Sequence, residues 1–142
     1  MTSIIGELDW RKDGDSHVKL LSPIEYQLDC GRIVMAERGF RYDGGSIPPP
    51  FRSLVCPFGS AADHGFCLHD RLYKGHRDLQ ERSFTRLQAD EAMLEVFLHC
   101  GVPSHIAYGV YTGVLAGGLA AWQTEAEKIQ WDMHEDKTFL DQ

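Results

Sequence analysis

This sequence of 142 residues lacks the features of a disulfide-rich protein. Its four cysteines are Cys30, Cys56, Cys67 and Cys100, and they form neither a CxxC pair nor the tight spacing of a disulfide framework. We also expect no signal peptide at the N-terminus. The sequence therefore favours free, buried thiols and a fold held by a hydrophobic core, which a single domain of this length is able to build.

Positive charge is scarce as well. The chain has 14 lysines and arginines against 21 aspartates and glutamates, which gives a net charge of −7 and a pI near 5.4. A nucleic-acid-binding surface needs a clustered basic face, and a polybasic tail or membrane anchor needs a run of like charges. Because the sequence has no such run, we expect no nucleic-acid partner and no polybasic anchor.

Charged residues are missing altogether from residues 101–124, a stretch long enough to cross a bilayer. Within it, Gly109, Gly113 and Gly117 recur every four residues, a spacing that also occurs where membrane helices pack together. Histidine, tyrosine, threonine and glycine residues nevertheless keep its hydropathy modest for a membrane span. We predict no transmembrane span here, and instead a buried central helix that starts near Pro103.

The first 42 residues predict a small antiparallel β-meander. Residues 17–21, 25–28 and 32–36 are short runs rich in β-branched or bulky apolar residues, and turn signals separate them. An aspartate-glycine turn is expected at residues 12–15. No chemistry-bearing side chains converge in this part, so we interpret it as a scaffold.

Residues 43–59 form a segment rich in glycine and proline. Paired glycines are followed by three prolines, which favour a rigid, extended path. Loop carbonyls and a carboxylate can hold a cation there, or the segment is simply a stiff turn between sheet and helices. The candidates are Asp43 and Gly45 for a metal ion, and Ser46, Ile47 and Arg52 for substrate contacts.

Three helices are predicted in residues 60–122. The first spans residues 60–74, with Ser60 or Asp63 as its N-cap. Gly65 costs about 1 kcal/mol in a helix interior, so either the helix begins later or a neighbour packs closely against this glycine. The second spans residues 83–100 and ends at Gly101. Its predicted apolar side consists of Phe84, Leu87, Met93, Leu94, Phe97 and Leu98. The anchors expected for the charged tail are Trp122, Trp131 and Phe139.

The first helix carries a base, a carboxylate and a phenol within about one turn. His69 and Tyr73 are four residues apart and share a face, while Asp70 projects about 100° away from His69. Asp90 lies in the second helix. If the two helices pack together, His69 and Asp90 form a dyad, and Tyr73 can hydrogen-bond Asp90.

Such a dyad suits hydrolysis. A neutral imidazole can take a proton from water, and a carboxylate on its other nitrogen fixes the tautomer and stabilises the imidazolium. Asp70 is then free to bind a hard cation such as Ca²⁺ together with loop carbonyls. The cation would polarise an ester or phosphoryl oxygen.

Two other interpretations of these residues stay open. The same side chains can form a buried structural network without any reaction. A Zn²⁺ site could use His64, His69 and His76 with Asp63 or Asp70, but His64 and His69 are five residues apart and diverge by about 140° on a helix. Phosphate-loop and serine-nucleophile signatures are absent.

Two resemblances add to this reading. The order of Asp43-Gly44-Gly45-Ser46-Ile47-Pro48, His69-Asp70-Arg71-Leu72-Tyr73, Ala89-Asp90 and Gly101-Val102 resembles DUF1353, an uncharacterised family of bacteriophage and prophage proteins. That resemblance spans residues 17–122 and implies a phage or prophage origin without supplying a function.

The helix pair over residues 66–97 also resembles phospholipases A2. The likeness implies that His69 activates water, Asp70 ligates Ca²⁺, Asp90 orients His69 and Tyr73 hydrogen-bonds Asp90. The glycine- and cysteine-rich calcium loop of the secreted enzymes is missing from this sequence, as is their disulfide set.

The sequence thus predicts one α+β domain with an N-terminal β-meander, a Gly/Pro loop, a three-helix bundle over residues 60–122 and a tail over residues 123–142. We hypothesise a phage-encoded hydrolase that acts on lipid or another ester. The alternatives are a virion or assembly protein, associated with tail or capsid, and a small inhibitor of a host protein. We expect it in the host bacterial cytoplasm or on the virion.

Overall fold

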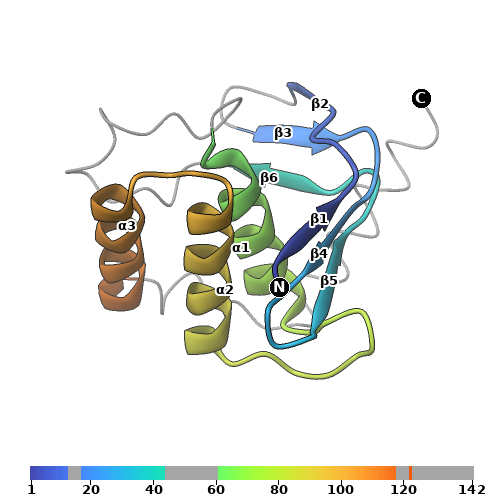
Figure 1. The fold of residues 1–142 in the computed structure, drawn as a ribbon. Coiled ribbons are helices and arrows are strands. Elements are labelled where there is room, and N and C mark those ends of the chain that lie inside the picture. Colours follow the sequence, from blue (N-terminus) through green and yellow to red (C-terminus); the bar gives the residue numbers. More distant parts are fainter. Residues whose placement is uncertain (13–16, 44–60, 118–121, 123–142) are drawn as a thin grey trace.

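The computed structural model describes residues 1–12, 17–43, 61–117 and 122, which form strands followed by helices (Figure 1). The strands are β1 (Ser3–Ile5), β2 (Trp10–Lys12), β3 (His17–Leu20), β4 (Ile24–Gln27), β5 (Ile33–Ala36) and β6 (Arg41–Asp43). The helices are α1 (Asp63–Gly75), α2 (Arg86–His99) and α3 (Ser104–Gly117). This arrangement confirms the α+β class.

The strands form two three-stranded antiparallel sheets instead of one consecutive meander. Their orders are β1-β4-β5 and β2-β3-β6, so β1 pairs with β4 and β3 pairs with β6 across intervening chain. Alternation buries Ile24 and Tyr26 of β4 on one face, and Tyr26 stands opposite Val34 of β5. Strands β1, β2 and β6 were not predicted, because three residues are too few to show a periodicity.

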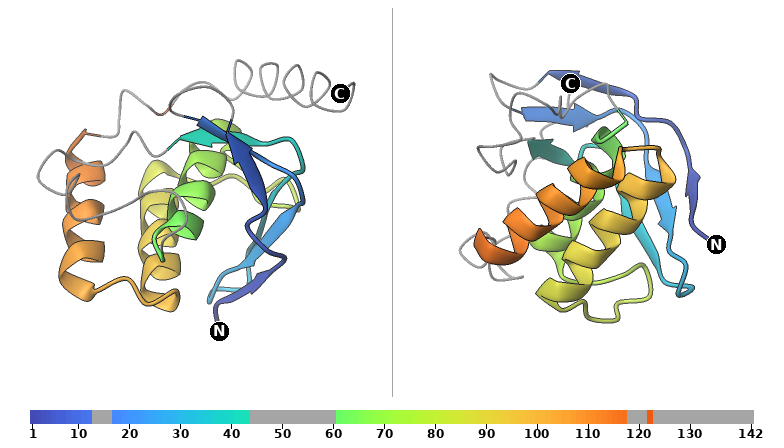
Figure 2. Two further views of the ribbon diagram at one scale, coloured as in Figure 1. Left: turned by 90° about the horizontal axis from the view of Figure 1, so that it is seen from above. Right: turned by 60° about the vertical axis from the view of Figure 1, so that its left-hand side comes forward.

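Helix α1 occupies the middle of the molecule. It lies between the sheets and α2, and α3 packs on the far side of α2 (Figures 1 and 2). One face of α1 buries Leu68 and Leu72 in the core shared with both sheets. Phe66 points to the second core, which α2 and α3 complete. Both helix–helix and helix–sheet packing therefore fix the position of α1.

Helix α3 is an edge helix, so the prediction of a buried central helix for residues 101–124 is wrong. Its buried residues are Ile106, Ala107, Val110 and Val114. They face α2, whereas Tyr108 is half exposed. Among the described residues, no helix is long and apolar enough to cross a bilayer.

The start of α1 differs from the prediction in its cap. The N-cap is Ala62, whose side chain accepts no capping hydrogen bond, and the helix begins at Asp63. The close packing of α2 requires a glycine at position 65, because a Cβ at this position would collide with the ring of Phe97. The predicted alternative of a closely packed neighbour is thus confirmed, and it sets how near α1 and α2 can come.

Helix α2 begins with a capping box. The Thr85 hydroxyl accepts a hydrogen bond from the Gln88 backbone N–H, and the Gln88 side chain accepts one from the Thr85 N–H. The prediction of its apolar side is wrong at two residues, because the side chains of Leu87 and Leu98 are 51% and 38% exposed. The buried face of the helix includes Met93 and Phe97, as predicted, and also Ala89, Asp90, Ala92 and Val96.

Several expectations concern residues outside the described part of the chain. These are the turn at residues 12–15, apart from residue 12, the loop at residues 44–59, Ser60, Cys56, Trp131 and Phe139.

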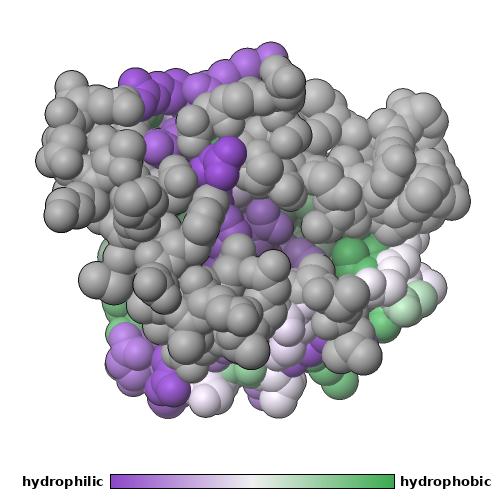
Figure 3. Space-filling model, turned by 180° about the vertical axis from the view of Figure 1, so that it is seen from behind, coloured by the Kyte–Doolittle hydropathy of each residue, from purple (hydrophilic) through white to green (hydrophobic). Residues whose placement is uncertain are grey.

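The described cysteines are free, but only Cys67 is buried, while Cys30 is exposed and Cys100 half-buried. On the face seen from behind, hydrophilic residues gather along the upper edge, and the lower rim carries both hydrophilic and hydrophobic residues (Figure 3).

Candidate functional site

The predicted dyad forms at the interface of α1 and α2. His69 Nε2 lies 2.7 Å from Asp90 Oδ1. The two side chains are 3% and 0% exposed. A carboxylate oxygen only accepts hydrogen bonds, so Nε2 carries the hydrogen and the lone pair of the neutral ring lies on Nδ1. The predicted contact between the helices is confirmed, and the ring is held in the tautomer that a base needs.

Tyr73 completes the predicted contacts. Its hydroxyl donates a hydrogen bond to the same Asp90 oxygen at 2.7 Å, and its ring lies 4.1 Å from the His69 ring, centroid to centroid. Burial, the hydrogen bond to Asp90 and the negative charge of Asp90 raise the pKa of Tyr73. Tyr73 therefore stays a neutral donor near pH 7 and holds Asp90 from a second direction.

The second oxygen of Asp90 is used differently. Oδ2 is buried and accepts no hydrogen bond from the described residues. Arg86 Nη1, one helical turn earlier on α2, lies 3.9 Å from this oxygen. Sequence reasoning missed Arg86, although its spacing of four residues from Asp90 was a usable signal.

Trp122 lies against the same cluster from a third segment. Its ring meets Tyr73 edge-on at 4.9 Å and stacks in parallel on His76 at 3.7 Å. Trp122 is half-buried and packs on the main core. It was expected to anchor the chain after α3, and it also gives the dyad an aromatic neighbour.

The predicted metal ligands are less fully described. Asp70 is half-buried on α1, next to His69, and Asp43 is the last residue of β6. The structure does not describe the Asp43 side chain, and the other candidates lie outside the described residues, namely Gly45, Ser46, Ile47 and Arg52. Among the side chains that are described, no group of three could hold a metal ion. The Ca²⁺ site stays a prediction.

The histidines suggested for Zn²⁺ face different neighbours. Nδ1 of His64 lies 2.9 Å from the hydroxyl of Tyr26, whereas His69 faces Asp90 and His76 stacks on Trp122. Burial lowers the pKa of His64. The three rings therefore do not converge on one point.

Comparison with known proteins identifies the family of this chain. The family model described as "Protein of unknown function (DUF1353)" matches residues 18–114. The chain belongs to the DUF1353 family. No curated protein and no solved structure matches it. The DUF1353 match includes His69, Tyr73 and Asp90, whereas Trp122 lies beyond it. The resemblance to phospholipases A2 remains a prediction.

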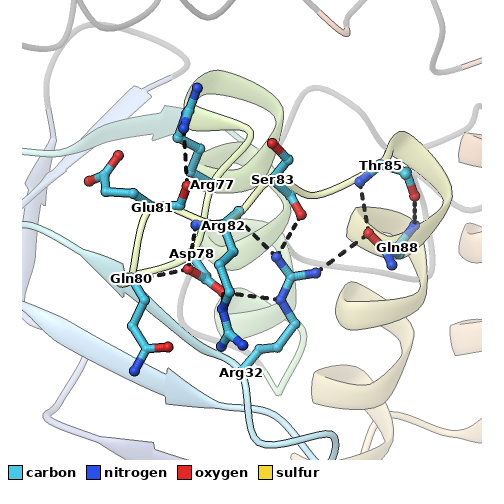
Figure 4. A network of polar contacts seen from close by, with 9 residues as sticks. All are labelled: Arg32, Arg77, Asp78, Gln80, Glu81, Arg82, Ser83, Thr85 and Gln88. Carbon is cyan, nitrogen blue, oxygen red and sulfur yellow. Dashed lines mark hydrogen bonds and ion pairs between the residues drawn. The ribbon is translucent and has the colours of Figure 1, made fainter.

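Two further buried carboxylates lie in the matched part of this DUF1353 protein. Asp63 accepts hydrogen bonds from the hydroxyl of Tyr42 at 2.7 Å and from Nε1 of Trp10 at 3.2 Å. Asp78 lies in the connection between α1 and α2 and is bound on both oxygens (Figure 4). The sequence suggested Asp63 only as an N-cap or a Zn²⁺ ligand and did not indicate Asp78, because the partners of Asp63 are distant in sequence and Asp78 lies in an irregular segment.

Proposed function

We propose that this protein is a hydrolase in which His69 is the general base and Asp90 orients it. The observation that carries the proposal is the 2.7 Å contact between His69 Nε2 and Asp90 Oδ1. It directs the lone pair of His69 to Nδ1, and Asp90 stabilises the imidazolium that forms when Nδ1 takes a proton.

The proposed reaction is ester hydrolysis. Water loses a proton to Nδ1 of His69 as its oxygen bonds to the ester carbonyl carbon. The tetrahedral intermediate then expels the alcohol oxygen, which takes the proton back from His69, and the products are an acid and an alcohol. Tyr73 keeps Asp90 in place throughout.

Lipid is the substrate class that we favour. The rings of Tyr73 and Trp122 give the dyad an apolar border, and the helix pair has the residue order of phospholipases A2. Oxygen ligands suit Ca²⁺. Asp70 is the candidate ligand with a described carboxylate, and it directly follows His69 of the dyad. A Ca²⁺ ion bound there would supply electrostatic stabilisation of the developing negative charge. We further propose a phage origin, with action in the host cytoplasm.

Burial of the dyad favours a second candidate function. His69 and Asp90 are 3% and 0% exposed, which is typical of a structural network inside a virion or assembly protein. In that case the partner is another phage protein, or a host protein that this one inhibits. Removal of one member of a structural pair costs about 1 to 3 kcal/mol, whereas removal of a catalytic residue often costs little stability.

Hydrolysis assays on phospholipid vesicles and on soluble esters, with Ca²⁺ present, test the proposal. We expect His69→Ala to lower kcat by about 10³-fold while the variant stays folded. The control is His99→Ala, since His99 is exposed at the end of α2. An active His69→Ala protein would remove the basis of the proposal.

Calorimetric titration of Ca²⁺, and then of Zn²⁺, into metal-free protein tests the metal separately. Saturable Ca²⁺ binding that Asp70→Asn abolishes supports the metal-assisted form of the reaction. If neither ion binds, the metal-assisted mechanism is wrong and the structural candidate gains.

A further inference from the structure

Arg86 connects two parts of the molecule that sequence reasoning treated separately. It is the first residue of α2, and its guanidinium donates hydrogen bonds to the backbone carbonyls of Val114 and Leu115, each at 3.2 Å. These carbonyls belong to the last turn of α3, where backbone acceptors lack partners within the helix and the helix dipole is negative. The guanidinium is therefore fixed by α3.

The same guanidinium also reaches the dyad. Its Nη1 lies 3.9 Å from Asp90 Oδ2, and its positive charge lies close enough to Tyr73 to lower the pKa of that hydroxyl against the larger effects that raise it. Asp90 is therefore contacted from both sides, because Arg86 faces Oδ2 while Tyr73 and His69 donate to Oδ1. The positive charge faces the one Asp90 oxygen that lacks a hydrogen bond from the described residues.

We propose that Arg86 is a positioning residue of the His69–Asp90 dyad and that it makes the geometry of the dyad depend on the docking of α3. This inference rests on the hydrolase function proposed above. Arg86 acts through Tyr73 and Asp90 and need not touch the substrate. Its charge offsets that of Asp90 and attracts Oδ2, which keeps Oδ1 directed at His69 and Tyr73.

A purely structural role for Arg86 makes a different prediction. The interface of α2 and α3 is also held by apolar side chains, including Met93, Ile106 and Val110. A methionine at position 86 can replace the stem of the arginine in this interface but not its charge. A lysine keeps the charge and loses the fork that binds two carbonyls.

The test compares Arg86→Met and Arg86→Lys with the control Arg82→Met. Arg82 lies in the connection just before α2, and its side chain is 56% exposed and pairs with Asp78. We expect Arg86→Met to lower kcat by about 100-fold with KM within about threefold, since a misplaced catalytic group costs that much. The kcat of Arg86→Lys should be at least about tenfold higher than that of Arg86→Met. Arg82→Met should keep the wild-type kcat.

Wild-type kcat in Arg86→Met, or an Arg86→Lys variant as slow as Arg86→Met, would overturn the inference while an inactive His69→Ala protein still upheld the hydrolase. An NMR readout does not depend on activity. The resonance of the Nε2 proton of His69 should move in Arg86→Met and stay in place in Arg82→Met at the same pH. If it stays in place in both folded variants, Arg86 does not position the dyad.

Discussion

Asp78 and Asp90 are both buried, 5% and 0% exposed, yet the protein uses them in opposite ways. Asp78 Oδ1 accepts hydrogen bonds from the backbone N–H groups of Gln80 and Arg82, both at 2.9 Å. Its Oδ2 accepts from the side chains of Arg32 at 3.1 Å and Arg82 at 2.9 Å (Figure 4). Every acceptor direction of Asp78 is occupied by a group of the fold itself.

Within the described part of the chain, Asp90 accepts hydrogen bonds on one oxygen only. Its Oδ1 accepts from His69 and Tyr73, while Oδ2 faces Arg86 at a distance too long for a hydrogen bond. The comparison teaches that burial alone does not identify a reactive carboxylate. Asp78 is saturated by groups of the fold, whereas Asp90 is held on one side and directed at His69, as the proposed function requires.

The largest effect expected from breaking this contrast is on catalysis. Asp90→Asn should lower kcat by about 10³-fold or more, because an amide favours the wrong tautomer of His69. Steady-state hydrolysis of the substrate found in the screen measures this. Asp78→Asn, the matched substitution at the saturated carboxylate, should leave kcat unchanged, and an equal loss in both variants would remove the contrast.

The next largest effect is on stability. Asp78→Asn should lower the free energy of unfolding by about 3 kcal/mol, since the amide directs N–H groups at the guanidinium of Arg32 or loses both backbone donors. Urea denaturation followed by circular dichroism measures the change. A loss below about 1 kcal/mol would show that the hydrogen bonds of Asp78 are not what secures the connection between α1 and α2.

A smaller effect is expected at Gly65, which sets the spacing of the helices that carry the dyad. In Gly65→Ala the new methyl group collides with the ring of Phe97, and overpacking of this kind costs about 1 to 3 kcal/mol. The thermal midpoint should fall, and kcat should fall with it because α2 moves away from His69. Gly117→Ala is the control and should change neither quantity, since a Cβ at this position meets no described residue within 4 Å.

The smallest effect concerns pH. Burial raises the pKa of Asp78, but the Arg82 N–H, the Arg32 side chain and the Gln80 N–H outweigh it, so the pKa lies below its ordinary value. A carboxyl with a lowered pKa in the folded state adds stability above its unfolded pKa and loses that stability as the pH falls through its folded pKa. The free energy of unfolding should therefore decline below about pH 4. It should decline less steeply in Asp78→Asn, and parallel declines would contradict the assignment.

Local periodicity was sufficient to predict the centre of the candidate site. His69 and Tyr73 share a helix face because they are four residues apart, and Asp90 lies in a strongly helical run, so the helix pair and its contacts were accessible from the sequence. Gly65 was a usable signal for the same reason, since an interior glycine indicates a close neighbour. These features depend on short spacings along the chain.

Features that depend on distant partners could not be predicted. Trp10 and Asp63 are 53 residues apart in sequence and meet only because β2 passes the start of α1. Leu87 was expected in the core and is exposed, because α1 and α3 both cover α2 and select which of its faces are buried. The role of Arg86 likewise required the end of α3 to be placed beside α2.

We propose that Asp90 is held for chemistry while Asp78 holds the fold, and the free energy of unfolding of Asp90→Asn distinguishes these two roles. Asparagine keeps a carbonyl oxygen for Tyr73 and removes a buried charge, so we expect a loss of no more than about 1 kcal/mol beside the larger loss in Asp78→Asn. A loss in Asp90→Asn equal to or above that of Asp78→Asn would contradict the account and make the His69–Asp90 pair a structural network.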